Sequence, residues 1–394
     1  MGLFHMLLLV SLIMIQVGNI DSKCFSAIFN FGDSTSDTGE DHAAFPDHLP
    51  VPYGSTFFKK PAGRASDGRL IIDFLASCLF SLKLIFEIND GMMLMNNLAA
   101  EALGLHFLTP YLKPEGSFKN GVNFAAVGAA ALPPNSSFPT LFPLSVFNLG
   151  VQLQQMREFK SIVEEVHKHG SKKRFPSPKV FGKSLYMLYI GQADIVSQVE
   201  TLGADGVKQF FPRMVSSISH TIRELYGLGG RTFWVFGVGP AGCDPIIRVI
   251  VNQASSYLDS GGCYFPLNDA VSEYNKLLRE SLWEIRGENP EASIIYVDTF
   301  SVKLDLFKNP THYGLKYGAK VCCGHGGGLF NFDLHAQCGS PNATACKDPW
   351  NYVSWDGAHL TEAANRVIAR EILNGSLFEP SFPLKKLGRI HGST

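Results

Sequence analysis

Three residues have the types that nucleophilic catalysis by a serine requires, although they lie near opposite ends of the chain. Ser34 stands in the run FNFGDSTSDTG (29–39), directly after an apolar stretch. Asp356 and His359 lie in the run WDGAHLTEAAN (355–365), before an Ala-rich amphipathic segment. A nucleophilic serine needs a base, and the base needs a carboxylate that holds its tautomer and stabilises the imidazolium. A D-x-x-H turn supplies both groups, provided that the fold brings it to Ser34.

Each of these residues also has an ordinary structural interpretation. Ser34 could be a turn serine between a strand and a helix, because the chain contains no G-x-S-x-G nucleophile elbow. Asp356 could cap the helix that follows, with His359 in its first turn. Asp33 and Asp37 resemble a glycosidase carboxylate pair only superficially. We expect Asp33 to brace the turn around Ser34, and Asp37 to contribute to the first turn of the next helix.

Apolar stretches that end in turn residues alternate with amphipathic segments along the chain. The stretches, most of them rich in β-branched or aromatic residues, are 27–34, 121–129, 185–194, 231–240 and 292–299. The segments 207–229 and 269–290 have the apolar spacing of helices. Strands alternating with helices indicate a parallel sheet covered on both faces, whose ligands bind at the carboxyl ends of the strands. No repeat or linker divides the chain, so a single domain over 23–394 is expected.

Charge and composition exclude some partners. The chain has 394 residues and a net charge of −1, and its one basic cluster, HKHGSKKR (167–174), is expected to be a solvated loop. Neither nucleic acid nor an anionic membrane is indicated as a partner. His167 and His169 have no further cluster of ligands around them, so neither a metal nor another cofactor is expected.

The N-terminus and the cysteines indicate export. An apolar stretch at 6–17 predicts a signal peptide over 1–22, and no later run has the length of a transmembrane helix. Eight cysteines without a zinc-type C-x-x-C pair predict disulfides formed in an oxidising compartment, with the pairing left open. Candidate glycosylation sequons begin at Asn135, Asn342 and Asn374.

Four blocks of the sequence carry a family resemblance. They are FNFGDSTSDTG (29–39), GVNFAAVGAAAL (121–132), YIGQAD (189–194) and WDGAHLTEAAN (355–365). In this order they resemble the four blocks of the plant GDSL esterase/lipase family, within the SGNH hydrolases. The likeness runs from about residue 24 to the C-terminus and includes 52–76, 237–245 and 321–332. It implies a flavodoxin-like α/β/α sandwich with a central parallel sheet, and a serine that lies in G-D-S.

The resemblance also implies roles for individual residues. Ser34 resembles the family's nucleophile, with His359 as the general base and Asp356 as its orienting carboxylate. The N–H groups of Ser34 and Gly128 resemble two donors of the oxyanion hole. The family's third donor is an Asn side chain, whose place is taken here by Ala193.

The replacement at Ala193 has a chemical consequence. Removing one oxyanion donor typically costs about 10²–10³ in turnover, and Ala has no side-chain donor. Gln192 is adjacent, but neighbouring side chains on an extended segment point apart, so we do not expect it to substitute. The oxyanion hole is therefore predicted to lack one donor.

Two further segments depart from expectation. Residues 77–100 interrupt the family pattern with a largely apolar stretch, which we interpret as retained intron sequence or a gene-model error. The HGGG run at 325–328 resembles the oxyanion loop of α/β-hydrolases, but no G-x-S-x-G follows it. We interpret it as a Gly-rich turn.

The favoured function is a secreted carboxylic ester hydrolase that acts through a serine acyl-enzyme in the cell wall or apoplast. Its substrate would be a small-molecule, lipid or glycan ester, such as an acetylated glycan or an acyl lipid. The alternative is a catalytically impaired homologue that binds a glycan or lipid. No cofactor, nucleic acid or stable membrane insertion is expected.

Overall fold

The computed structural model describes residues 25–81, 107–113, 115–134, 140–170, 173–251 and 255–381. The predicted signal peptide, residues 82–100 of the unusual segment and the sequon at Asn135 lie outside the described residues.

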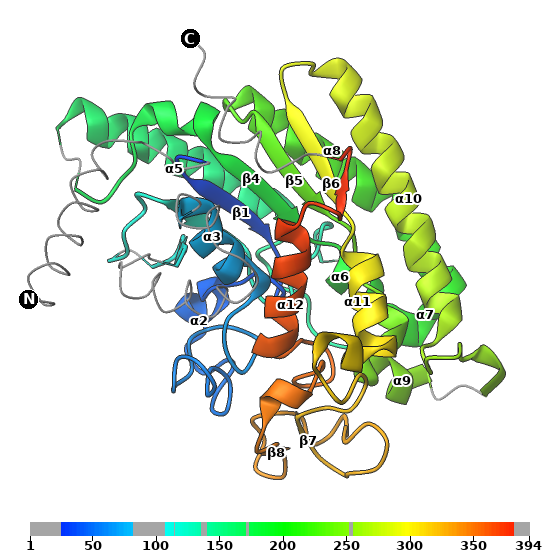
Figure 1. Cartoon of the computed structure of the whole chain (residues 1–394). Helices are drawn as coiled ribbons and strands as arrows, with labels where there is room; N and C mark the ends of the chain where they lie inside the picture. The colour runs from blue at the N-terminus through cyan, green and yellow to red at the C-terminus, as the bar shows by residue number, and fades with distance from the viewer. Residues whose placement is uncertain are drawn as a thin grey trace, which may run out of the picture.

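A seven-stranded, mostly parallel sheet forms the centre of the described chain (Figure 1). Its order is β2-β3-β1-β4-β5-β6-β9, and only the β6–β9 pair is antiparallel. The strands are β1 (Ile28–Gly32), β2 (Thr109–Pro110), β3 (Gly121–Asn123), β4 (Leu185–Tyr189), β5 (Thr232–Phe236), β6 (Ser293–Val297) and β9 (Phe378–Glu379). All five predicted strands are confirmed. They are shorter than predicted because the residues after them turn away from the sheet.

The strand order determines where a ligand can bind. β1 lies between β3 and β4, so the chain first builds one side of the sheet and then the other. The order β3-β1-β4-β5-β6 is that of a flavodoxin-like fold, which confirms the predicted fold class. Loops diverge at such a reversal and leave a crevice outside the carboxyl end of the first strand. Ser34 follows β1 at this point.

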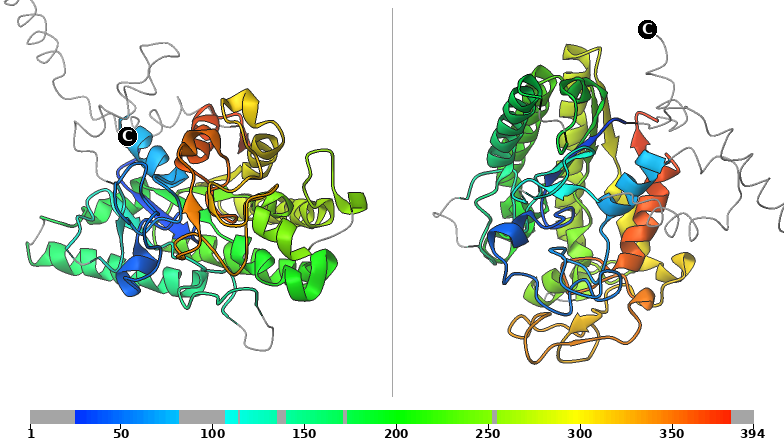
Figure 2. Two further views of the ribbon diagram at one scale, coloured as in Figure 1. Left: turned by 90° about the horizontal axis from the view of Figure 1, so that it is seen from below. Right: turned by 90° about the vertical axis from the view of Figure 1, so that its left-hand side faces the viewer.

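Helices cover both faces of the sheet, and Figure 2 shows the resulting three layers in its right-hand view. One face packs against α5 (Leu149–Lys168), α8 (Phe211–Gly227) and α10 (Phe265–Glu288). The other packs against α3 (Ile71–Ser81), α11 (Thr299–Lys308) and α12 (Glu362–Leu373). The two predicted helices are confirmed as α8 and α10, with boundaries shifted by a few residues. The shorter helices are α2 (Glu40–Ala44), α6 (Gln192–Val196), α7 (Val199–Gly206) and α9 (Pro245–Val251).

Strand β1 shows why the sheet needs both helical layers. All five of its residues are buried, as in a parallel strand that is covered on both sides. Side chains alternate between the faces of a strand. Phe29 and Phe31 therefore join the core formed by α5, α8 and α10, whereas Ile28 joins the core formed by α3, α11 and α12.

Three disulfides among the described residues confirm the expectation from the cysteine content. The pairs are Cys243–Cys263, Cys322–Cys346 and Cys323–Cys338. The first joins the β5–α9 connection to the segment before α10. The other two hold a loop region that includes the short strands β7 (Cys323–Gly324) and β8 (Thr344–Ala345). The HGGG run is an exposed turn in this region, with three glycines at positive φ, as predicted.

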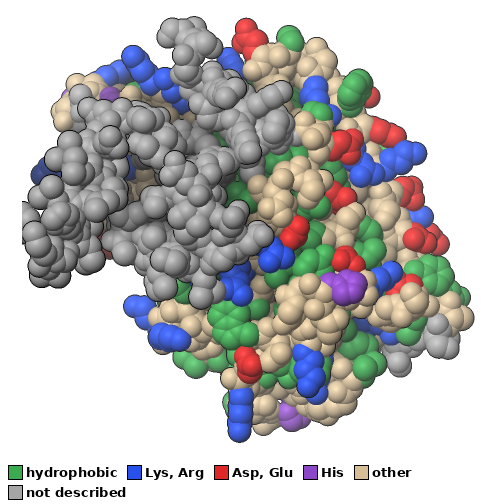
Figure 3. All heavy atoms as spheres, in the orientation of Figure 1, with side chains coloured by type: hydrophobic (Ala, Val, Ile, Leu, Met, Phe, Trp, Pro, Cys, Tyr) green, Lys and Arg blue, Asp and Glu red, His purple; other side chains and the backbone are tan. Residues whose placement is uncertain are grey.

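The surface shows no dominant charge on the face that is visible in Figure 3. Acidic and basic side chains are interspersed over the described part of this face. No helix within the described ranges has both the length and the apolar character needed to cross a bilayer.

Candidate active site

Ser34 lies in a tight turn that begins where β1 ends. Gly32 closes the strand, and a Cβ atom there would lie 2.5 Å from the carbonyl oxygen of Tyr189 on β4. Only glycine therefore fits at this position. The next residue, Asp33, accepts hydrogen bonds from the N–H (2.9 Å) and the hydroxyl (2.7 Å) of Thr35, and so braces the turn as expected.

The structure brings Ser34 together with the D-x-x-H turn from the far end of the chain. Nε2 of His359 lies 2.8 Å from Oγ of Ser34, and Nδ1 lies 2.7 Å from Oδ2 of Asp356. Asp356 also accepts hydrogen bonds from the N–H groups of Ala358 (3.0 Å) and His359 (2.8 Å). Its Oδ2 accepts a further bond from the hydroxyl of Tyr53 at 2.9 Å. The carboxylate is thereby fixed in the orientation that holds the imidazole.

Asp356 and His359 each stabilise the charged form of the other. Burial by itself would raise the pKa of Asp356, but the charge and hydrogen bonds of His359 and the N–H of Ala358 hold it below its ordinary value. Burial would lower the pKa of His359, yet Asp356, together with the charges of Asp33 and Asp244, holds it above its ordinary value. An imidazole in this setting readily accepts the proton of a serine hydroxyl.

The segment that carries Tyr53 is attached to the loop that carries His359. Oδ1 of Asp67 accepts the N–H of Glu362, the first residue of α12, at 2.7 Å. The carboxylate of Glu362 in turn accepts from the N–H (2.8 Å) and the guanidinium (2.6 Å) of Arg69. These buried contacts tie two distant parts of the sequence into one wall of the site.

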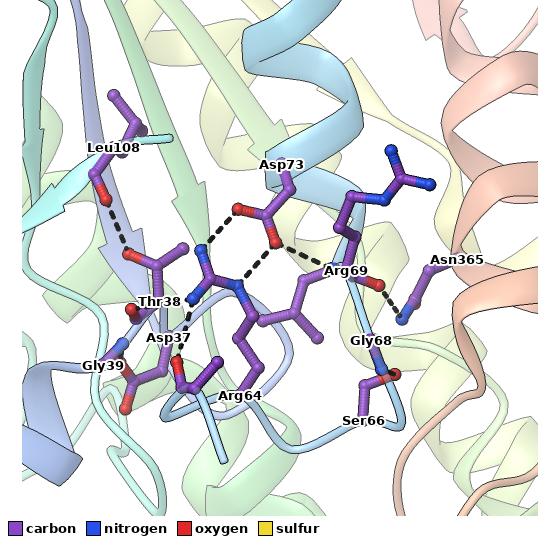
Figure 4. Close-up of polar contacts among 12 residues, drawn as sticks. Asp37, Thr38, Gly39, Arg64, Ser66, Gly68, Arg69, Asp73, Leu108 and Asn365 are labelled. Carbon is purple, nitrogen blue, oxygen red and sulfur yellow. Dashed lines mark hydrogen bonds and ion pairs between the residues drawn. The ribbon is translucent and has the colours of Figure 1, made fainter. Parts of the chain in front are cut away.

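Figure 4 shows how the same segment is fixed to α3 and to the turn after Ser34. The guanidinium of Arg64 donates to both oxygens of Asp73, at 2.8 Å each, and to the carbonyl of Thr38 at 3.2 Å. Asn365 of α12 donates to the carbonyl of Arg69 at 3.1 Å. Both members of the Arg64–Asp73 ion pair are buried, so loss of either would leave an uncompensated charge.

Two buried carboxylates hold the loop that contains Gly128. Asp37 accepts the N–H of Val127 through Oδ2 at 3.0 Å, and its two oxygens together accept three N–H groups at the start of α2. Asp194 of α6 accepts the N–H groups of residues 131–132 at 2.7 and 3.0 Å. Gly128 has a φ of +71°, which favours glycine. The loop is thus anchored on both sides of the candidate oxyanion residue.

Ala193 and Gln192 both line the cavity at the end of β4, and they lie in the first turn of α6, so the expectation of an extended segment was wrong. Ala193 brings no polar side-chain atom to it. Nε2 of Gln192 donates to Oδ2 of Asp244 at 3.1 Å, so its side chain is turned toward the β5–α9 connection.

A cavity of about 650 Å³ opens beside Ser34, within the usual range for small-molecule sites. Gly128, Ala193, Asp356 and His359 also line it. The polar lining includes Asp33, Gln192, Asp244 and Lys303, and the apolar lining includes Phe45, Leu141, Phe142, Leu144, Val146, Phe332 and Leu334.

Sequence reasoning missed three residues of this site: Tyr53, Asp244 and Lys303. Tyr53 and Asp244 stand in the stretches 52–76 and 237–245, which the family resemblance had already marked. Lys303 stands in α11 without a motif around it, so only folding reveals its place. The sequons at Asn342 and Asn374 are exposed and lie outside the cavity lining.

Known proteins are similar to this sequence over nearly its whole length. The profile of the GDSL-like lipase/acylhydrolase family matches residues 28–372. A GDSL esterase/lipase of Arabidopsis thaliana is 46% identical over 393 residues, which cover 97% of this chain and 96% of the relative. An esterase of Hevea brasiliensis is 36% identical, covering 95% and 92%. A relative from Arabidopsis thaliana named alpha-L-fucosidase 3 is 37% identical, covering 89% and 91%.

Proposed function

The chain belongs to the GDSL-like lipase/acylhydrolase family and is a hydrolase of ester bonds, and we propose that it cleaves carboxylic esters through an acyl-enzyme on Ser34. The observation that carries this proposal is the continuous hydrogen-bonded chain from Ser34 through His359 to Asp356. It lies at the carboxyl end of β1, in a cavity large enough for an ester of moderate size.

The proposed reaction has two steps. Oγ of Ser34 attacks the ester carbonyl carbon while its proton passes to Nε2 of His359, and the alcohol then leaves with that proton. The acyl group remains on Ser34. A water molecule next gives a proton to His359 and attacks the acyl carbonyl. Ser34 leaves, regains the proton, and the carboxylic acid is released. Asp356 orients the imidazole and stabilises its charge in both steps.

The oxyanion in this mechanism is stabilised by backbone groups. We assign the N–H groups of Ser34 and Gly128 to that role, with Asp37 and Asp194 holding the Gly128 loop in place. Ala193 adds no donor, so we propose that turnover is lower than a third donor would permit.

We also propose that the enzyme is secreted. The apolar N-terminal stretch, the exposed sequons at Asn342 and Asn374 and the three disulfides support export to the cell wall or apoplast. The interpretation of residues 77–100 as retained intron sequence stays a prediction that sequencing of the transcript tests.

Hydrolysis of short-chain 4-nitrophenyl esters tests the catalytic proposal. We expect Ser34→Ala to lower kcat by at least about 10³, because the acyl-enzyme cannot form. Ser161→Ala, at an exposed serine on α5, is the matched control and should retain full activity.

We expect Ala193→Asn to raise kcat by at least about tenfold in the same assay, since an added amide donor stabilises the oxyanion.

Two outcomes would contradict the proposal. Equal inactivity of the parent and the Ser34→Ala variant would favour the alternative, an impaired homologue that binds a glycan or lipid. Cleavage of 4-nitrophenyl α-L-fucoside without cleavage of any ester would indicate instead the activity that the name of the fucosidase relative states.

A further inference from the structure

Three polar residues of the cavity lining come from the segments that follow β4, β5 and β6. Gln192 follows β4, Asp244 follows β5, and Lys303 lies in the helix that follows β6. A group of apolar residues of the lining comes from the position directly after α2 and from the segment 141–146 after β3. We call Gln192, Asp244 and Lys303 the polar subsite. We call the second group the apolar wall, made of Phe45, Leu141, Phe142, Leu144 and Val146.

Lys303 is the most unusual member of the polar subsite. It is 7% exposed, and its Nζ lies 5.1 Å above the ring centre of Tyr189. Burial lowers the pKa of the ammonium, but Tyr189, Asp244 and Asp33 raise it above its ordinary value, so the group is charged. A hydrogen bond with the Tyr189 hydroxyl contributes to this rise, and among the described residues no carboxylate lies within ion-pair distance of the ammonium. A buried ammonium in this state gains from a hydrogen-bond acceptor in the cavity.

The backbone is shaped to admit the lysine side chain. A Cβ atom at Gly239 would lie 2.8 Å from Cδ and 3.2 Å from Nζ of Lys303. The absence of a side chain at residue 239 therefore leaves the path along which the lysine reaches the cavity.

Asp244 supplies the complementary acceptor. Within the described chain, the amide of Gln192 is the one hydrogen-bond donor found for its carboxylate. Burial raises its pKa to about 7, and the charges of Lys303 and His359 oppose that rise. Most of the hydrogen-bonding capacity of this carboxyl group is thus open to a ligand.

We propose that the cavity takes an apolar acyl ester of a polyhydroxylated alcohol, with the hydroxyl groups of the alcohol held by Gln192, Asp244 and Lys303. A hydroxyl group donates to Asp244 and accepts from Lys303, so neighbouring hydroxyls satisfy both. A simple alkyl alcohol would leave most of the hydrogen-bonding capacity of Asp244 and Lys303 unused, which a polar site penalises. Asp33 and Asp244 disfavour an anionic alcohol, and Lys303 disfavours a cationic one.

The apolar wall accounts for the acyl part of the ester. Phe45 and Val146 are 44% and 63% exposed, so apolar surface extends from the cavity to solvent. An acyl chain of several carbons would cover it, with about 0.8 kcal/mol gained for each buried methylene group. An acetyl group would leave most of it uncovered.

This inference rests on the proposed function, and a comparison of two octanoate esters tests it separately. The substrates are methyl 6-O-octanoyl-glucoside and 4-nitrophenyl octanoate, which share the acyl group and differ in the alcohol. The measured quantity is kcat/KM for the glucoside ester divided by kcat/KM for the nitrophenyl ester. We expect Lys303→Met and Asp244→Asn each to lower this ratio by at least tenfold. Asp244→Asn is nearly isosteric, so it keeps the test informative if Lys303→Met folds poorly.

The control is Lys316→Met. Lys316 also lies 5.1 Å above a tyrosine ring, that of Tyr317, but it is exposed and outside the cavity lining. This variant should leave the ratio unchanged.

The outcomes separate the two proposals. Inactivity of the parent protein toward both esters overturns the proposed function. Hydrolysis of the nitrophenyl ester with an unchanged ratio in both subsite variants overturns the polar subsite alone. A parent that prefers 4-nitrophenyl acetate to the octanoate overturns the role of the apolar wall.

Discussion

At the scale of single residues, Tyr53 and His359 share one oxygen of the Asp356 carboxylate. The hydroxyl of Tyr53 donates to the same carboxylate oxygen, Oδ2, that faces the imidazole. A donor at that atom withdraws negative charge from it, which weakens the stabilisation of the protonated base. We therefore expect Tyr53 to lower the basicity of His359 without touching the reacting atoms.

The Tyr53→Phe variant makes this measurable. Because the pKa of His359 is raised above 6.5, kcat/KM of the parent should fall as the pH drops through a value above 6.5 and the base becomes protonated. Removal of the hydroxyl should move this limb to higher pH and lower kcat about tenfold through looser positioning of Asp356. Tyr257→Phe, at a 45% exposed tyrosine, is the control. Superimposable pH profiles of Tyr53→Phe and the parent would refute the role.

At the scale of elements, the Cys323–Cys338 disulfide closes a loop that contributes to the cavity wall. The loop contains Phe332 and Leu334, and the two cysteines are 15 residues apart. Its fixed shape keeps these apolar side chains against the site.

Replacing both Cys323 and Cys338 with serine should lower the free energy of unfolding by about 3 kcal/mol, the loop-closure value for 15 residues. Urea denaturation of the variant and the parent measures the difference. KM for the octanoate ester should rise more than KM for the acetate ester. A variant as stable as the parent would show that this disulfide does not constrain the unfolded chain.

The elements also show what the sequence could predict and what it could not. Strands β1, β3, β4, β5 and β6 and the helices α8 and α10 follow from local composition and apolar spacing, so they were predicted. The two-residue strands β2, β7, β8 and β9 have too few residues for such a pattern and were not. Disulfide pairing depends on which loops meet, and the sequence left it open. The positions of Tyr53, Asp244 and Lys303 depend on strand order and helix packing, which no local pattern encodes.

At the scale of the whole molecule, burial of several carboxyl groups links stability to pH. Desolvation raises the pKa of Asp37 to about 7, Glu40 to about 8, Asp194 to about 6 and Asp244 to about 7. In the unfolded chain such groups lose their protons near pH 4. Between about pH 4 and 8 the folded protein therefore binds more protons, and the free energy of unfolding falls as the pH rises.

We expect Tm to be higher at pH 5.5 than at pH 8 by at least about 3 °C, as scanning calorimetry can measure. Glu40→Gln should reduce this difference, because it removes a buried charge and can donate to the unpaired Oε1 of Gln155. Glu115→Gln, at an exposed position, should leave the difference unchanged. A Tm that rises between pH 5.5 and pH 8 would contradict the assignment.

The separation of Ser34 and His359 along the chain has a consequence during synthesis. The two residues are 325 positions apart, and the loop of His359 is held against the site by contacts with residues 53–69. At roughly 5–20 residues per second, a ribosome adds His359 about 15 to 65 s after Ser34. Ser34, the proposed nucleophile, therefore remains without its proposed base while most of the sheet is made. We therefore expect that a nascent chain cannot attack esters in the compartment where it is synthesised until α12 has emerged, and that a chain cut before residue 356 is inert however well the sheet folds.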